Sequence, residues 1–581
     1  MKSLLKYLKN YKKETVLAPL FKMLEASFEL FIPLVMAQII DVGIANHDGD
    51  YIRKMCIVMV VLGLVGLACA VTAQYFSAKA ATGFAAELRM ALFTHIQKLS
   101  HAKMDTLGTS TLITRMTSDI NQVQSGVNLV LRLFLRSPFI VIGAMVMAFT
   151  VDVKGALVFV VTIPVLSVIV FGIMLYTMPL YKKVQSHLDK VLLKTRENLT
   201  GARVIRAFNK QESEREEFEH QNQVLTDAQK FVGGISGLMN PLTYIVVNVA
   251  TMALLYIGAV RVDSGILTQG EVVALVNYMS QILVELVKLA SLIISISKAI
   301  ACGNRIQNIF EVEPEKKDGE FVWGDGEEQS QIEFQNVSLT YEGNSAESLT
   351  DISFKVRKGQ TIGIIGGTGS GKTSVVNLIP AFYEASKGCV LINGKNVNDY
   401  QKDDLRKKIG IVPQKAVLFK GTIEENLRWG NEDATAQEMW KALHLAQAVA
   451  FVDQKGAGLA FEITQEGKNL SGGQKQRLTI ARALVRRPEI LILDDSASAL
   501  DFATDKALRE ALQNMNYSPT TFIVSQRTSS IRHADKILVM EDGRLVGEGT
   551  HNELLDSCDI YREIHDSQFE IPKEKEGAQG E

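Results

Sequence analysis

Residues 366–373 read Gly-Gly-Thr-Gly-Ser-Gly-Lys-Thr and lie between the apolar run 361–365 and the helix-like segment 374–379. Glycines at these positions let backbone N–H groups wrap around phosphate oxygens. The lysine supplies a cation to the β and γ oxygens, and the hydroxyl after it can ligate Mg²⁺. A strand before the loop and a helix after it favour an α/β nucleotide domain. The residues predicted to bind ATP here are Gly366, Gly367, Thr368, Gly369, Ser370, Gly371, Lys372 and Thr373.

A second apolar strand, expected at 490–493, ends in the carboxylate Asp494. A carboxylate at the end of a buried strand, downstream of a phosphate loop, is placed to hold Mg²⁺ directly or through water. Further strands are expected at 331–341 and 359–365, interleaved with helical patterns. This alternation is typical of a nucleotide-binding α/β fold.

The run 470–477, Leu-Ser-Gly-Gly-Gln-Lys-Gln-Arg, resembles the signature motif of the ABC ATPases. In that family the motif begins a helix and caps the γ-phosphate of a nucleotide bound to the other domain of a dimer. Helix N-termini favour anions because their N–H groups are unpaired and the dipole is positive there. The residues that carry this resemblance are Leu470, Ser471, Gly472, Gly473 and Gln474.

The resemblance covers nearly the whole chain and implies further site residues. Tyr341 matches the aromatic residue that stacks on adenine, and Asp501 matches the D-loop. Gln414 matches the Q-loop glutamine that senses Mg²⁺ and the membrane domain, so the implied Mg²⁺ set is Thr373, Gln414 and Asp494.

The first half of the chain holds six apolar segments, each of roughly 20 residues or more, the length that spans a bilayer. Lys and Arg gather in the long segments 79–127 and 180–237, which places both termini and these segments in the cytoplasm. Helical periodicity continues through them, so the spans should extend beyond the membrane and turn back at 109–122 and 201–210. By resemblance to exporters these turns are coupling helices. The expected spans are 15–45, 53–78, 128–150, 155–179, 238–261 and 272–298.

These patterns predict an α-helical six-span transmembrane domain followed by an α/β P-loop ABC nucleotide-binding domain. We expect the transmembrane domain at 1–312, a linker at 313–330, the nucleotide domain at 331–569 and a disordered tail at 570–581. The resemblance places the chain, multi-pass, in a bacterial cytoplasmic membrane in contact with lipid.

Two positions depart from the family pattern. Hydrolytic members carry a glutamate after the strand aspartate, where this chain has Asp495, and a switch histidine where it has Gln526. A shorter carboxylate is misplaced as a general base, and an amide cannot become cationic. These changes are either tolerated variation or the mark of a degenerate catalytic site that binds ATP and cleaves it slowly. The second reading implies a heterodimer with another ABC half-transporter, as in bacterial heterodimeric multidrug exporters, whose competent site would be completed by Ser471 of this chain.

Ionisable residues within the spans are costly and usually face a protein interior or a wet cavity. Glu25 and Glu29 share one helix face and are candidates for a substrate cavity; internal ion pairing, or a position at the membrane edge, is the alternative. Other ionisable pairs in the spans are Arg132 with Arg136 and Glu285 with Lys288.

Composition narrows the function. The 581-residue chain has a formal net charge of -2, which gives no electrostatic reason to expect nucleic acid. Its five cysteines are scattered and lack metal-ligand spacing. The prediction is ATP-driven export of small amphipathic compounds, including drugs. Export of a lipid, peptide or small metabolite, or a regulatory subunit that holds ATP, are the alternatives.

Overall fold

The computed structural model describes residues 2–315, 319–324, 331–515 and 517–568. They form two compact units. Unit 1 comprises residues 1–97 and 110–312, and unit 2 comprises 98–109 and 313–581. The linker predicted at 313–330 lies partly outside the described residues, and the tail predicted at 570–581 lies wholly outside them.

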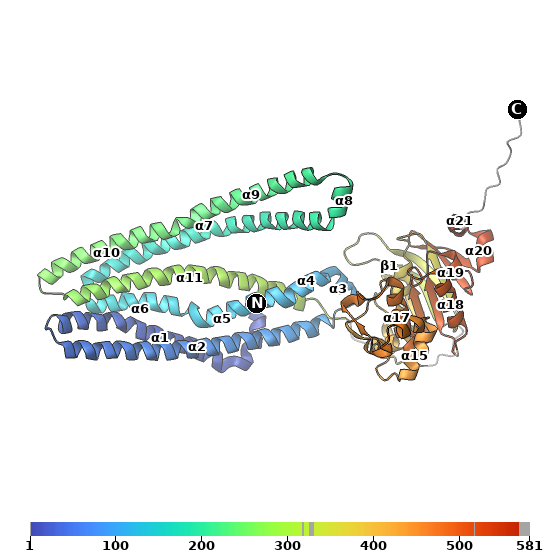
Figure 1. Ribbon diagram of the computed structural model, residues 1–581, viewed down its shortest axis with the longest axis horizontal. Helices are drawn as coiled ribbons and strands as arrows, with labels where there is room; N and C mark the ends of the chain where they lie inside the picture. The colour runs from blue at the N-terminus through green and yellow to red at the C-terminus, as the bar shows by residue number, and fades with distance from the viewer. Residues whose placement is uncertain (1, 316–318, 325–330, 516, 569–581) are drawn as a thin grey trace, which may run out of the picture. The chain divides into compact units, whose positions relative to one another are not determined.

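Unit 1 is helical throughout its described part. It contains six helical stretches of 42 to 53 residues, each long and apolar enough to cross a membrane. A helix of 48 residues is about 72 Å long, more than twice the roughly 30 Å of hydrocarbon in a bilayer, so the helices extend beyond it. This confirms the prediction of six candidate spans. Figure 1 shows the helices side by side, with α7 paired along α9 and α10. Their bounds are α1 (Lys12–Gln38), α2 (Gly49–Ile96), α4 (Thr109–Thr114), α5 (Ile120–Leu129), α6 (Arg136–Val151), α7 (Val153–Thr200), α8 (Ala202–Ala207), α9 (Gln211–Gly237), α10 (Met239–Asp263) and α11 (Gln269–Phe310), with short helical segments at Lys2–Tyr11, Ile39–Ile44, Arg115–Asp119 and Val130–Phe134.

The first turn lies earlier than the sequence indicated. The chain reverses around the short helix α3 (His101–Leu107), which belongs to unit 2. The Ser100 side chain caps its first turn by accepting from the Lys103 backbone, and Gly108, with a φ of 75°, ends it. The prediction of a turn at 109–122 is therefore wrong, because that stretch is part of the returning helix.

The error has a physical cause. The stretch 109–122 is rich in Ser, Thr and Asn, which favour turns when their side chains compete with the backbone. Here the Thr114 hydroxyl donates to the Ser110 carbonyl at 2.9 Å, and the Thr117 hydroxyl donates to the Ile113 carbonyl at 2.8 Å. The hydroxyls are satisfied inside the helix, so the helix continues.

The second turn contains α8, which lies between α7 and α9 at 202–207. Its side chains leave an apolar surface open to solvent. Phe208 is 72% exposed and Val204 is 60% exposed.

An ion cluster centred on the buried Arg136 and Glu285 ties three helices of unit 1 together. Arg136 on α6 donates to Glu285 on α11 at 2.6 Å and also pairs with Glu29 on α1. Glu285 accepts two more bonds, from Ser137 at 2.7 Å and from Lys288 at 2.9 Å. Every charge in the cluster has a partner, as burial in a membrane domain requires.

Removing one member of this cluster should destabilise the fold. We expect Glu285→Ala to lower the free energy of unfolding by about 3–5 kcal/mol, because Arg136 then loses its most buried partner. Thermal unfolding in detergent measures the change. The control is Glu212→Ala, which removes an exposed pair with Arg215 and should leave the melting temperature nearly unchanged. Equal melting temperatures for the two variants would contradict the role given to the cluster.

Unit 2 is built on a six-stranded sheet of order β12-β11-β3-β10-β9-β6. All neighbouring strands are parallel except β12, which is antiparallel to β11. Parallel strands buried on both faces read as unbroken apolar runs, which is why β3 and β9 could be predicted. A four-stranded sheet of order β2-β1-β4-β5 lies beside the same core, in which Phe334 stacks on Phe354 with ring centroids 4.4 Å apart.

The strands are β1 (Ile332–Leu339), β2 (Leu349–Val356), β3 (Thr361–Gly366), β4 (Lys387–Ile392), β5 (Lys395–Asn396), β6 (Ile409–Val412), β7 (Gly421–Thr422), β8 (Glu462–Ile463), β9 (Ile490–Asp494), β10 (Thr520–Val524), β11 (Lys536–Glu541) and β12 (Arg544–Gly549). The α-helices of this unit after α3 are α12 (Lys372–Leu378), α13 (Lys402–Lys407), α14 (Ile423–Arg428), α15 (Ala436–Leu445), α16 (Val449–Gln454), α17 (Gly472–Val485), α18 (Phe502–Gln513), α19 (Thr528–Ile531), α20 (His551–Ser557) and α21 (Asp559–Gln568).

The register of the central strands places three sequence motifs at one edge. Val524 of β10 pairs with Ile364 of β3 on one side and with Asp494 of β9 on the other. The carboxyl ends of these strands therefore meet, and in open α/β sheets this edge is where ligands bind.

Candidate nucleotide-binding site

The loop 366–373 connects β3 to α12 and depends on glycine at two points. Gly371 precedes the helix with a φ of 93°, a left-handed conformation that side chains disfavour. A Cβ at Gly366 would lie 2.0 Å from the Met540 carbonyl oxygen, so no larger residue fits against β11. The two glycines let the loop curl at the end of the strand.

Lys372 lies inside this curl. Its Nζ donates to the carbonyl oxygens of Gly366 at 2.9 Å and Gly367 at 2.6 Å. Burial lowers the pKa of the Lys372 ammonium, against the opposing charges of Asp495 and Asp494. The direct hydrogen-bond acceptors of this buried cation are neutral, and the carboxylates act on it from a distance. The ammonium is therefore suited to pair with an incoming phosphate anion.

Thr373 and Asp494 meet across the same edge. The Thr373 hydroxyl lies 3.0 Å from both carboxylate oxygens of Asp494. Burial raises the pKa of the Asp494 carboxyl, and the neighbouring charge of Asp495 acts in the same direction. A divalent cation would stabilise the charged carboxylate, and a hydroxyl with a carboxylate are the hard oxygen ligands that Mg²⁺ prefers. The residues present therefore fit Mg²⁺, which would neutralise phosphate charge there.

These groups line one cavity of about 500 Å³. Its lining includes residues that were predicted from separate motifs: Tyr341, Gln414, Asp494, Asp495 and Gln526. Three predicted residues belong to the loop but do not line the cavity: Gly366, Gly367 and Ser370. The full lining is Tyr341, Glu347, Ser348, Thr368, Gly369, Gly371, Lys372, Thr373, Ser374, Gln414, Asp494, Asp495, Val524, Gln526, Asp542 and Gly543.

Some lining residues could not be found from the sequence. Glu347 and Ser348 precede β2, and Asp542 with Gly543 forms the turn between β11 and β12. The Asp-Gly pair is a hairpin signal, and both residues have positive φ. That signal locates a turn but not the cavity beside which the turn lies.

Tyr341 is held on two sides. Its hydroxyl donates to the Ser374 hydroxyl at 2.9 Å, and its ring meets Tyr383 edge-on with centroids 5.0 Å apart. One ring fixed by two contacts at the cavity wall is suited to stacking on a flat base.

Replacing the ring tests this role. We expect Tyr341→Ala to weaken ATP binding about two- to tenfold, the range of a lost aromatic contact of about 0.5–1.5 kcal/mol. Tyr341→Phe keeps the ring and loses only the bond to Ser374, so it should bind ATP nearly as well as the parent chain. Titration with a fluorescent ATP analogue measures both. Equal losses in the two variants would assign the effect to the hydroxyl instead of the ring.

Asp495 lies beside Asp494 with a φ of 45°, a left-handed conformation that aspartate tolerates better than most residues. Gln414 Nε2 donates to its carboxylate at 3.3 Å. Gln526 follows β10 and lines the same cavity, while its carbonyl accepts from Gln568 at 2.7 Å. The two divergent residues are thus brought to the same cavity as the phosphate loop.

The signature residues lie elsewhere in unit 2. Ser471 caps α17 by accepting from the Gln474 backbone at 3.3 Å, and the Gln474 side chain accepts from the Ser471 backbone at 3.0 Å. Ser471 and Gly472 are exposed. Asp501 caps α18 in the same way, accepting from the Thr504 backbone at 2.9 Å. Of the described residues that line the nucleotide cavity, none comes from Leu470–Gln474 or is Asp501.

Only one of the two glutamates proposed to line a substrate cavity does so among the described lining residues. Glu29 lines a cavity of about 390 Å³ in unit 1, together with Glu285 and Lys288. Glu25 pairs with Lys22 and is not among the described residues that line this cavity. Both carboxylates are ion-paired, as the alternative interpretation expected.

Comparison with known proteins gives the family. The model described as the ABC transporter transmembrane region matches residues 15–286, and that described as ABC transporter matches 349–498. The uncharacterized ABC transporter ATP-binding protein YfiB of Bacillus subtilis is 35% identical and aligns over 98% of this chain and 99% of its own length. The putative multidrug export ATP-binding/permease protein YgaD of the same organism is 32% identical over 97% of this chain and 98% of its own.

The fold has a counterpart among solved structures. The structure of a bacterial Atm1-family ABC exporter with ATP bound superposes with a TM-score of 0.79 at 22% identity, covering 97% of this chain and 99% of that one. Six membrane helices followed by a nucleotide-binding unit, together with these relatives, define the assignment. The chain belongs to the ABC transporter family, as a multi-pass half-transporter that combines the transmembrane region with the ATPase domain and has the fold of an ABC exporter.

Proposed function

We propose that this chain is the slowly hydrolysing half of a heterodimeric exporter that moves amphipathic compounds across a bacterial cytoplasmic membrane, with both termini in the cytoplasm. The observation that carries the proposal is the position of Asp495 and Gln526 in the cavity that Lys372 and Asp494 also line. In this position both residues act on the phosphates, so their chemistry decides the rate of cleavage.

Asp495 is poorly suited to be the general base. Its carboxylate is one methylene shorter than glutamate, which withdraws the oxygens by roughly 1.5 Å. A general base must reach its water within about 2.6–3.2 Å. The bond from Gln414 further fixes the position of this carboxylate. Displacement on this scale costs on the order of 100-fold in rate.

Gln526 weakens the second hydrolytic element. Its amide can donate a hydrogen bond to a phosphate oxygen, but it carries no charge. Charge builds on the γ-phosphate oxygens in the transition state, where a cation is worth more than a neutral donor. Binding is therefore preserved while cleavage is slowed.

Two exposed surfaces of this chain support the proposal of a partner chain. The capped N-terminus of α17 is exposed and supplies nothing to the chain's own nucleotide cavity. The exposed Phe208 and Val204 at α8 form an apolar surface that a soluble chain would cover. We infer that the signature completes a partner's ATP site and that α8 docks on a partner's nucleotide domain.

The cavity around Glu29 supports amphipathic cargo. Its lining mixes apolar side chains, such as Ile32, Met36 and Val284, with the amides of Asn277 and Gln281. The side-chain oxygen Oε1 of Gln281 is buried and has no hydrogen-bond partner in the described part of the chain. Because Glu29 already pairs with Arg136, the cavity favours polar, weakly charged groups over simple cations. The description of the relative YgaD as a putative multidrug export protein agrees with this class.

In the proposed cycle, the loop 366–373 and Lys372 hold ATP for a long time on this chain. The bound nucleotide keeps the two nucleotide domains together, and cleavage at the partner's site separates them again. Turns such as α8 pass this motion to the membrane helices.

Purified protein tests the proposal. We expect the chain alone to bind ATP and hydrolyse it slowly, and the chain with its partner to hydrolyse it at least about tenfold faster. The partner with this chain's Ser471→Ala variant should lose most of that gain, whereas Lys358→Ala, at an exposed position outside the cavity, should not. Brisk turnover by the chain alone would refute the slow-site proposal.

A further inference from the structure

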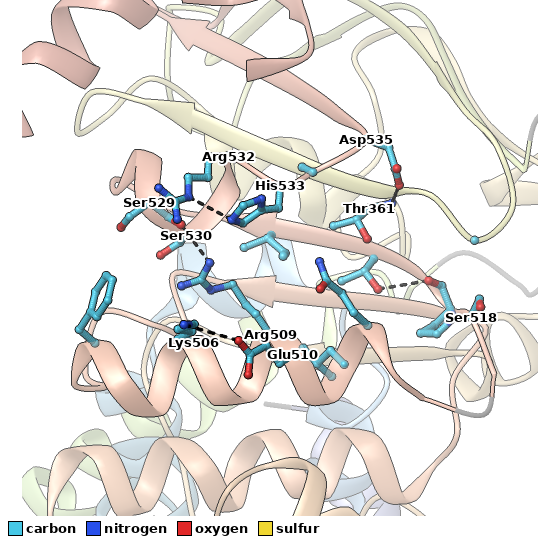
Figure 2. A pocket seen from close by; sticks show the side chains of 18 residues that line it. Thr361, Lys506, Arg509, Glu510, Ser518, Ser529, Ser530, Arg532, His533 and Asp535 are labelled. Atoms are coloured by element: carbon cyan, nitrogen blue, oxygen red, sulfur yellow. Dashed lines mark hydrogen bonds and ion pairs between the residues drawn. The ribbon is translucent and has the colours of Figure 1, made fainter. Parts of the chain in front are cut away.

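Unit 2 contains a second cavity, of about 700 Å³, that the ATP chemistry does not use. It lies between α18 and α19, above the first residues of β3 and β10 (Figure 2). None of its described lining residues also lines the nucleotide cavity. The volume is within the range of about 300–1,000 Å³ that small organic ligands occupy.

One end of this cavity gathers cations. Figure 2 shows Lys506, Arg509 and Arg532 together there, from α18 and from the segment after α19. Arg509 pairs with the buried Asp505 at 3.1 Å, whereas Lys506 is only loosely paired with the exposed Glu510 at 3.8 Å. The charge of Lys506 is therefore available to a ligand.

Arg532 has no carboxylate partner among the residues that the structure describes. Its side-chain Nε donates to His533 Nε2 at 3.0 Å, a bond that requires this nitrogen of the ring to be unprotonated. Burial and the charges of Arg532 and Arg509 lower the pKa of His533 and so keep the ring neutral. The cationic end thus carries a guanidinium charge that nothing in the cavity neutralises.

The rest of the cavity has a different character. Asp535 lies at the opposite end, away from the arginines, and accepts from the Thr361 backbone at 2.8 Å (Figure 2). The lining also includes the apolar side chains of Leu512 and Ile523, beside the polar side chains of Gln513 and Thr521. A ligand that fits both parts needs an anionic group and an apolar body.

We propose that this cavity binds a small organic anion, an aromatic or short acyl body that carries a phosphate, sulfonate or carboxylate. The anionic group pairs with Arg532 and Lys506, and the body packs on Leu512 and Ile523. A cationic ligand would be repelled at the arginine end, and a neutral ligand would leave Arg532 uncompensated.

The position of the cavity gives the ligand a route to the ATP site. α18 begins at its cap Asp501, and α19 follows Gln526 by one residue. Arg509 already joins the two helices, since its Nη1 donates to the Ser529 carbonyl at 3.0 Å. An anion held by both Lys506 and Arg532 adds a second link, and so biases the positions of Asp501 and Gln526.

Calorimetry on the full chain in lipid nanodiscs tests the site, with empty nanodiscs as the blank. Saturating MgADP fills the phosphate loop, and 1-naphthyl phosphate is the probe. We expect one saturable site per chain, binding of the neutral 1-naphthol at least about tenfold weaker, and a similar loss in the double variant Lys506→Gln with Arg532→Gln. The matched control is Arg357→Gln with Lys407→Gln, two exposed cations outside both cavities, which should bind as the parent does.

The variants distinguish binding in the cavity from effects of folding and of net charge. Lys506 and Arg532 are exposed, so the double variant should keep the parent's melting temperature, which is measured alongside. Absence of saturable binding, or equal affinity in the double variant, overturns the proposal. Loss of binding in the control pair also overturns it, because it would reflect net charge and not the cavity. The measurement needs neither hydrolysis nor a partner, so its result is independent of the proposed slow site.

Discussion

Lys372→Ala should lower the affinity of this chain for MgATP about 100-fold. The ammonium is buried in the curl of the phosphate loop and is held by two carbonyl oxygens, so it faces the phosphates with little water to screen it. Truncating one partner of a buried, hydrogen-bonded charge pair costs about 2–5 kcal/mol, and 2.7 kcal/mol corresponds to about 100-fold. Equilibrium binding of a fluorescent ATP analogue measures the loss.

The same variant distinguishes two functions. Lys358→Ala is the control, since that lysine is exposed and lies outside the cavity. If the chain is part of the engine, Lys372→Ala stops transport while the heterodimer still assembles. Retained transport with ATP binding lost would instead show that nucleotide on this chain serves regulation or structure. Unchanged ATP affinity would contradict the site itself.

The second large expected effect is a gain in ATPase rate. Asp495→Glu combined with Gln526→His should raise the ATPase rate of the chain alone about 100-fold, because it restores the reach of the base and a side chain that can become cationic. Steady-state phosphate release from the purified, reconstituted chain measures it. Glutamate must adopt the left-handed backbone that Asp495 already has and that aspartate tolerates better, so a loss of up to about 1 kcal/mol in stability is expected as well.

Two further measurements make this result interpretable. The same pair of substitutions on a Lys372→Ala background should be inactive, which excludes a contaminating ATPase. A parent chain that already turns over quickly, and gains nothing from the pair, would show that Asp495 and Gln526 are tolerated variation.

The sequence predicted best what local patterns control. The loop 366–373 and the strand ending at Asp494 are continuous motifs, and their backbone conformations follow from glycine and from buried apolar runs. The length of the membrane helices followed from the unbroken helical period. The turn at α3 did not, because Ser and Thr side chains at 109–122 are satisfied within a helix whose neighbours decide its extent.

Contacts between distant residues were out of reach. Glu29 and Glu25 look alike in the sequence, yet only Glu29 reaches Arg136, 107 residues away. Asp542 and Gly543 line the nucleotide cavity through the pairing of β11 with β3. The cavity between α18 and α19 has no motif, because it arises from the spacing of two helices over the sheet.

The uncovered end of α8 has a consequence for how cells must produce this protein. In the proposed orientation, an isolated copy presents Phe208 and Val204 to the cytosol, where exposed apolar side chains recruit chaperones and proteases or lead to aggregation. If the chain forms the proposed heterodimer, copies made in excess of the partner should therefore be short-lived. Balanced synthesis of the two halves then becomes a requirement for steady membrane levels, and the abundance of one half limits that of the other.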